Sequence, residues 1–285
     1  MAGIAQQRTL ESKAAVPGVS LFTACPSVCT IHPAPVDHGL VFVRGGVRVE
    51  VDAGSICRDP VHPAFAKIPP RCSAVGSGES AVWLVEHVLS ALAGLGVTNA
   101  LIEVDHRELP IMDGSSLAYV EAIRSAGMVD QGKNAELVRI ASPIRVEQGD
   151  SWIELTPAES TSYQYTIDYG DDSPIARATV RWDGDPDDYA ARIAPARTFC
   201  LKHEAEMLQS AGLFTHLDEG DMLVLDASGP IGTTLRDPNE CAHHKLLDLI
   251  GDMALLGKPV VGRIKAHTSG HSMAHALVEK IANSQ

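Results

Sequence analysis

The stretch AHHKLLDLIGD, residues 242–252, has the composition of a buried helix but carries an ordered line of polar residues. His244, Asp248 and Asp252 recur every fourth residue, so they share one side of a helix that is otherwise mostly leucine and isoleucine. A buried carboxylate or imidazole is costly unless it is paired, hydrated or bound to a metal. Because His244 and Asp248 lie one helical turn apart, they can reach the same point. The stretch therefore predicts a buried helix that supplies two metal ligands.

A second apolar helix, predicted over residues 84–95, offers the missing ligand. A catalytic zinc takes three protein ligands, and His87 on this helix is the best third candidate. Glu86 precedes it, points off the ligand axis, and could act as general base toward an attacking water. His271 follows a glycine at a helix start, where we expect it to be exposed enough to exchange protons, with Asp252 placed to orient it. Since a lone histidine is more often structural, spacing alone leaves these roles open.

The two halves of the chain repeat one order of elements. In each half an apolar helix bearing a histidine is followed by glycine, a strand, a loop with glycine and serine, and a shorter amphipathic helix. This order predicts an α+β fold with two domains of similar topology, each a sheet with helices, and the helices sandwiched between the sheets. The expected strands near the start cover residues 19–24, 28–33 and 40–51. The predicted divisions are a first domain over 1–128, a linker over 129–136, and a second domain over 137–285 with an insertion around 183–240 that includes a helix near 204–212.

Composition narrows the classes of function. The 285 residues are 45% hydrophobic, and the net charge of −13 argues against general binding to nucleic acid or to an anionic membrane. We expect no secretory leader and no integral membrane segment. Six cysteines without a CxxC pattern suit a reduced, cytoplasmic protein, and Cys25 and Cys29 lack the second pair that a structural zinc site needs. The oligomeric state is not determined by the sequence.

Several segments, taken together, resemble the zinc-dependent UDP-3-O-acyl-N-acetylglucosamine deacetylases, which catalyse the first committed step of lipid A synthesis in Gram-negative bacteria. They occur in order over nearly the whole chain: QQRTL (6–10), VEHVLSALAGLGVTNALIEV (85–104), LPIMDGSS (109–116), ARTF (196–199), LQSAGL (208–213), HHKLLDLIGD (243–252) and SGHS (269–272). The resemblance implies the same fold of two similar domains and a nucleotide-sugar substrate.

The resemblance also implies a role for each candidate residue. The metal, zinc or iron in its place, would be held by His87, His244 and Asp248, with Glu86 as general base and His271 as the cationic acid held by Asp252. The remaining implied roles are polarisation of the amide carbonyl by Thr198, contact of Lys245 with a substrate phosphate, and contact of Tyr169 and Phe199 with the substrate, Tyr169 against the uracil.

Four departures from the family pattern bear on the substrate. A His and two glycines are missing where the chain reads VSLFTAC (19–25), Leu84 replaces Thr, and Thr268 replaces a Lys, which weakens the case for a diphosphate. Acidic THLDEGD (215–221) replaces a Gly-Gly-Ser segment of the acyl passage, so we expect weaker selectivity for a long acyl chain. The sequence thus favours removal of acetate from a UDP-linked 3-O-acyl-N-acetylglucosamine. The alternatives are a deacetylase of the same mechanism acting on another N-acetyl sugar or small amide, and a non-enzymatic metal-binding protein.

Overall fold

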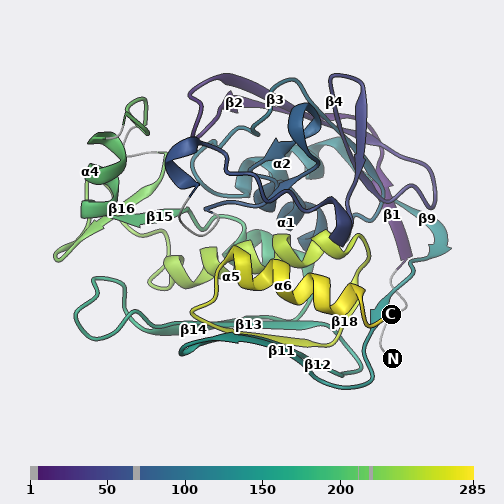
Figure 1. Ribbon diagram of the computed structural model, residues 1–285. Coiled ribbons are helices and arrows are strands. Elements are labelled where there is room, and N and C mark those ends of the chain that lie inside the picture. The colour runs from purple at the N-terminus through teal and green to yellow at the C-terminus, as the bar shows by residue number, and fades with distance from the viewer. Residues whose placement is uncertain (1–5, 67–70, 211, 218–220) are drawn as a thin grey trace.

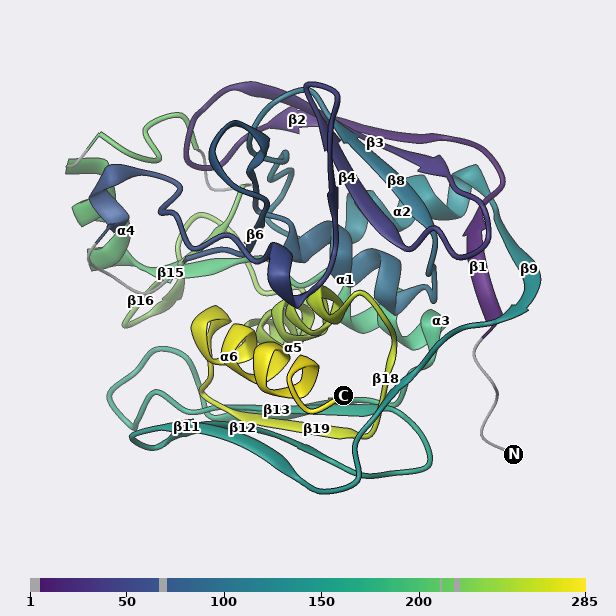
Figure 2. The same ribbon diagram turned by 45° about the vertical axis from the view of Figure 1, so that its right-hand side comes forward.

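The computed structural model describes residues 6–66, 71–210, 212–217 and 221–285. Two five-stranded sheets lie on opposite sides of the molecule, with the long helices between them (Figure 1). Turning the molecule shows the same layers from the side, with the first sheet above the helices and the second below (Figure 2). The α+β fold with sandwiched helices, predicted from the sequence, is confirmed.

The two sheets have the same topology. The first has the order β2-β3-β8-β4-β5 and the second β11-β12-β19-β13-β14, so in each half the last strand enters the middle. It pairs parallel to one neighbour, β4 or β13, and every other pairing within the two sheets is antiparallel. The strands of the first sheet are β2 Ala14–Val19, β3 Pro26–Pro33, β4 Leu40–Arg44, β5 Val47–Glu50 and β8 Ala100–Val104. Those of the second are β11 Ile144–Gln148, β12 Ser151–Thr156, β13 Ser162–Ile167, β14 Ala178–Trp182 and β19 Arg263–His267.

Along the sequence, one long helix precedes the middle strand of each sheet and another follows it. Helices α1 (Glu86–Gly94) and α2 (Leu117–Ala126) precede and follow β8, and α5 (Glu240–Met253) and α6 (His271–Ala282) do the same for β19. Helices α1 and α5 pack directly on each other between the sheets (Figure 2). Gly251 makes this contact close, since a Cβ there would lie 2.1 Å from the carbonyl oxygen of Glu86. Both helices are apolar almost all round because each is buried on several sides.

A side lobe extends from the second half, at the left of Figure 1. Its elements are β15 Phe199–Leu201, α4 Lys202–Ser210, β16 Leu223–Asp226 and β17 Gly229–Pro230, preceded by the short helix α3 Pro186–Asp188 and a π-helical turn, Tyr189–Ile193. Helix α4 corresponds to the helix predicted near residues 204–212. The remaining short strands are β6 Ala74–Val75, β7 Val82–Trp83, β10 Val138–Arg139 and β18 Val260–Val261.

Two segments differ from the expectation. Residues 19–24 were expected to be a strand, but β2 ends at Val19 and a turn follows. The buried carboxylate of Glu108 holds this turn, because it accepts hydrogen bonds from the amides of Phe22 (2.7 Å) and Thr23 (3.0 Å). The segment interpreted as a linker, 129–136, is mostly strand β9 (Met128–Asn134), which pairs antiparallel with β1 (Gln6–Leu10). Across the described ranges, every helix is too short or too polar to span a bilayer.

Candidate metal centre and active site

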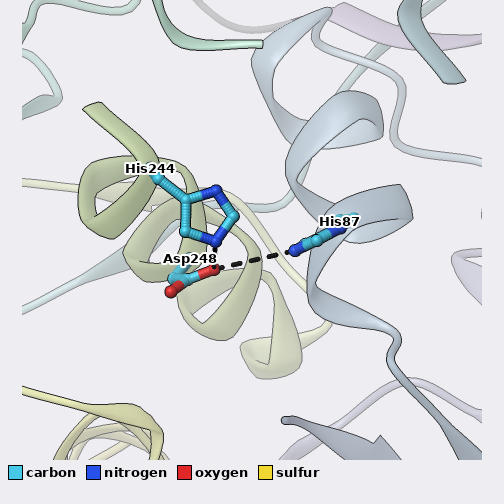
Figure 3. A group of neighbouring side chains, drawn as sticks. All are labelled: His87, His244 and Asp248. Carbon is cyan, nitrogen blue, oxygen red and sulfur yellow. Dashed lines mark ion pairs between the residues drawn. The ribbon is translucent and has the colours of Figure 1, made fainter. Parts of the chain in front are cut away.

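Two histidines and an aspartate meet where α1 and α5 touch. His87 lies in the first turn of α1, whereas His244 and Asp248 lie one turn apart on α5 (Figure 3). Asp248 Oδ1 is 3.3 Å from His244 Nε2 and 3.9 Å from His87 Nε2. One potential ligand atom from each residue lies within 4.8 Å of the other two, and all three side chains are buried. The spacing predicted within α5 and the predicted contact with the second helix therefore bring the three candidate ligands together.

The chemistry of these donors fits a divalent metal ion. Burial lowers the pKa of His87 to about 3, helped by neighbouring His244, and burial also lowers the pKa of His244, so both rings are neutral as metal binding requires. Burial alone would raise the pKa of Asp248, but nearby His244 and Lys245 hold it well below its usual range. His244 Nδ1 lies 3.0 Å from the carbonyl of Ala196, which directs Nε2 toward the cluster. Among the described residues His87 Nδ1 has no hydrogen-bond partner.

Lys245 and Glu86 border this cluster. Lys245 Nζ donates to Asp248 Oδ2 at 2.8 Å, and its ammonium lies 5.7 Å from the centre of the Phe199 ring. Glu86 is 2% exposed and accepts a hydrogen bond from the amide of Ser73 at 2.9 Å. Burial raises the pKa of Glu86 to about 8, so its carboxylate is a stronger base than that of an exposed glutamate.

His271 forms a buried pair with Asp252. Its Nδ1 lies 2.9 Å from Asp252 Oδ2, and its Nε2 points toward the cluster, 4.0 Å from Asp248 Oδ2. His271 is less exposed than expected, at 8%, because α6 packs against α5, although its side chain still lines a cavity. Burial disfavours the imidazolium, but Asp252 outweighs this effect by its charge and hydrogen bond and raises the pKa of His271 to about 9. His271 is therefore a cation near neutral pH.

A cavity of about 430 Å³ opens onto these groups. Glu86, His271 and Thr198 line it beside the three candidate ligands. Thr198 is fixed on both sides of its backbone, since its amide donates to the carbonyl of Gly114 at 2.7 Å and its carbonyl accepts from Leu223 at 2.8 Å. The rest of the wall is largely apolar and includes Leu21, Phe22, Phe65, Leu84, Ile111, Leu208, Phe214 and Met222.

A second, wider cavity of about 930 Å³ adjoins the first. Tyr169, which is 43% exposed, lies on its wall. Lys245, Phe199 and Arg71 line both cavities and therefore stand where one leads into the other. The structure thus places the candidate substrate contacts Tyr169, Phe199 and Lys245 along one continuous surface beside the cluster.

The structure shows the conformation and contacts of several positions that depart from the family pattern. Leu84 is buried with a left-handed backbone, at φ 66°, immediately before α1. Thr268 is also left-handed, at φ 45°, and its hydroxyl donates to the carbonyl of Asp168 at 3.2 Å. Phe22 packs against Phe65 and Phe214, with ring centres 5.4 and 5.6 Å away. Residues 218–220 of the acidic segment lie outside the described residues.

Sequence reasoning missed two residues of the site. Ser73 hydrogen-bonds to Glu86 and to Asp252, and Arg71 lines both cavities. Both lie in a segment whose composition has no helix or strand periodicity. No signal in the sequence links this segment to α5 or α6, because the contacts arise only when the two halves pack together.

This fold and cluster are typical of a metal-dependent hydrolase whose site is formed between two related halves. Comparison with known proteins gives the family. The family model for UDP-3-O-acyl N-acetylglycosamine deacetylase matches residues 7–283, and the chain belongs to this family.

Relatives in several bacteria support the assignment. A UDP-3-O-acyl-N-acetylglucosamine deacetylase of Anaeromyxobacter sp. (strain Fw109-5) is 36% identical over 276 residues, covering 96% of this chain and 88% of that protein. Proteins of the same name from Saccharophagus degradans and Acidithiobacillus ferrooxidans are 38% and 35% identical, each over 97% of this chain and 90% of their own length. The resemblance noted in the sequence is confirmed.

Proposed function

We propose that the chain hydrolyses the N-acetyl group of a UDP-3-O-acyl-N-acetylglucosamine and releases acetate, as a step of lipid A synthesis. The carrying observation is the group of His87, His244 and Asp248 at the α1–α5 contact, with Glu86 and His271 facing the same cavity. A structural metal site needs no neighbouring base and acid, so this arrangement favours catalysis over a purely metal-binding role. Membership of a deacetylase family makes the chain a hydrolase.

We assign metal binding to His87, His244 and Asp248, with zinc as the ion or iron in its place. The ion, when bound, would polarise the amide carbonyl and lower the pKa of a coordinated water. The two neutral imidazoles and one carboxylate suit such an ion.

The proton transfers are assigned to Glu86 and His271. Glu86 takes a proton from the water as its oxygen attacks the carbonyl carbon. The imidazolium of His271, held by Asp252, stabilises the oxyanion and then supplies a proton to the nitrogen as the carbon–nitrogen bond breaks. Thr198, on the same wall, contributes a hydroxyl donor to the carbonyl oxygen. Acetate and a free amine are the products.

We propose that different parts of the substrate occupy the two cavities. We place the uracil against Tyr169 and a phosphate beside Lys245, with Phe199 between the two cavities. The first cavity has an apolar wall that includes Phe22 and Phe65, and such a wall suits a hydrocarbon better than water. This wall favours a substrate with a 3-O-acyl chain over a plain N-acetyl sugar.

The test is an activity comparison on purified, metal-loaded protein. UDP-N-acetylglucosamine with and without a 3-O-acyl chain would be incubated with the protein, and acetate release followed. We expect turnover of the acylated sugar. Equal kcat/KM for both sugars would favour the alternative substrate without an acyl chain. Stoichiometric metal without any acetate release would favour the non-enzymatic reading and would overturn the proposal.

The compartment we propose is the cytoplasm. All six cysteines are free in the structure, at positions 25, 29, 57, 72, 200 and 241. Free thiols that are mostly buried suit a reducing compartment.

A further inference from the structure

Ser73 is fixed by its backbone against the start of α1. Its carbonyl accepts hydrogen bonds from the amides of Leu84 (2.9 Å) and Val85 (3.2 Å), and its own amide donates to Glu86 Oε2 at 2.9 Å. The left-handed backbone of Leu84 turns these amides toward Ser73. Because Ser73 is also fully buried, its side chain has a defined place relative to the proposed base.

The hydroxyl of Ser73 reaches the other side of the site. It donates its single proton to Asp252 Oδ1. His275 Nε2 lies 2.7 Å from the same hydroxyl oxygen, so the imidazole of His275 must be the donor in that bond. Burial lowers the pKa of His275, which agrees with a neutral ring protonated on Nε2. The hydroxyl therefore makes two hydrogen bonds: it donates to Asp252 and accepts from His275.

This bond controls how the Asp252 carboxylate can rotate. One of its oxygens, Oδ2, lies 2.9 Å from His271 Nδ1, while Oδ1 lies 3.2 Å from the same nitrogen and receives the Ser73 hydroxyl. Without the hydroxyl, among the described residues His271 is the remaining side chain within hydrogen-bond distance of the carboxylate, because His275 Nε2 lies 3.9 Å from Oδ1, and the carboxylate and the imidazole can turn together. With it, the plane of the carboxylate is set by a residue anchored to α1.

We propose that Ser73 is a positioning residue, whose hydroxyl orients the Asp252–His271 pair relative to Glu86. This inference rests on the proposed function, because the pair acts as proton donor only in that reaction. One residue thereby connects the proposed base on α1 with the proposed acid at the start of α6. Ser73 touches neither substrate nor metal ligand in this role, and it acts through Asp252.

The first test is the Ser73→Ala variant, which removes the hydroxyl and keeps the backbone amide. We expect kcat to fall by about 10- to 100-fold, since small misplacements of a catalytic group cost up to roughly that factor, with KM changed by less than about threefold. Metal content should be unchanged. Ser73→Cys keeps a weak donor of similar size, and its kcat should lie between those of the parent and the alanine variant.

Ser27→Ala is the matched control. Ser27 is also buried, on β3 of the first sheet, and its hydroxyl donates to the carbonyl of Glu108 at 2.7 Å, outside the α1–α5 contact. The control variant should lose about as much thermal stability as Ser73→Ala and should keep the kcat of the parent protein. An equal loss of kcat in both variants would mean that Ser73 has only a structural role.

A double-mutant comparison separates positioning from general damage. In a His271→Ala background the proposed acid is absent, so adding Ser73→Ala should change kcat by less than about twofold. The inference is overturned if Ser73→Ala keeps kcat within twofold of an active parent, or if its full effect persists without His271. An inactive parent with stoichiometric metal would instead overturn the proposed function.

Discussion

Replacing Gly251 by alanine tests whether the site depends on the close approach of α1 and α5. The added Cβ would lie 2.1 Å from the carbonyl oxygen and 2.8 Å from the carbonyl carbon of Glu86, whereas ordinary contacts lie at 3.4–4 Å. These obstacles are backbone atoms in a helix, so a rotamer change cannot relieve the overlap. The two helices must separate locally by about 1 Å or more.

This separation of the helices would move the residues on α1 away from those on α5. Glu86 and His87 would move with α1, and the two candidate ligands on α5 would stay behind. A displacement of this size costs about 10²-fold in rate when it affects catalytic geometry, and overpacking costs about 1–3 kcal/mol of stability. We expect Gly251→Ala to fold, to bind metal at least about tenfold more weakly, and to lose about 10²-fold in kcat/KM. Chelator competition, thermal unfolding and acetate release measure the three effects.

Gly94→Ala provides the comparison. A Cβ at Gly94 would lie 2.4 Å from the ring of Tyr189, so it also overpacks α1, but at the end of the helix away from His87. This variant should lose similar stability while keeping metal affinity and kcat. If Gly251→Ala matched Gly94→Ala in all three measurements, the contact between α1 and α5 would not set the metal geometry.

Four further outcomes are expected. His87→Ala or Asp248→Ala should strip the metal, and elemental analysis showing one ion per chain in both variants would disprove the ligand assignment. The pH profile of kcat/KM should be bell-shaped: activity rises as Glu86, or the water that it activates, loses a proton, and falls through pH about 9 as His271 loses its own. His271→Ala should remove the basic limb and cost about 10²–10⁴-fold in rate; an unchanged basic limb would contradict the role. Arg71→Ala should raise KM for the UDP-sugar several-fold with little change in kcat, because Arg71 lies between the cavities; an unchanged KM would show that it does not contact substrate.

Local patterns in the sequence predicted the parts of the fold that depend on periodicity. The apolar helices around His87 and His244, and the strand that follows each, produce the repeat, and both sheets have the expected common topology. The i, i+4 spacing of His244 and Asp248 was sufficient to predict two of the three candidate ligands. The third ligand followed from the repeat, because equivalent helices in two similar halves pack against each other.

Features that depend on single buried polar groups were not predictable. Residues 19–24 have the composition of a strand, but Glu108, distant in sequence, draws their amides into a turn. A glycine before a helix suggested a more exposed His271, whereas α6 packs against α5 and buries it. The segment around Ser73 has no periodicity or motif that would indicate its contacts. Such contacts form between segments far apart in the chain, and a sequence pattern records only near neighbours.

The duplication explains why the candidate chemistry lies between the halves rather than within one of them. The first half supplies His87 and Glu86, and the second supplies His244, Asp248, Asp252 and His271, so neither half alone contains three ligands with both a base and an acid. The burial that lowers the histidine pKa values and raises that of Glu86 arises where the halves meet, because α1 and α5 cover each other there. Docking of the two halves and assembly of the site are therefore the same event. A substitution that loosens the α1–α5 contact should alter metal affinity before it alters the fold of either sheet.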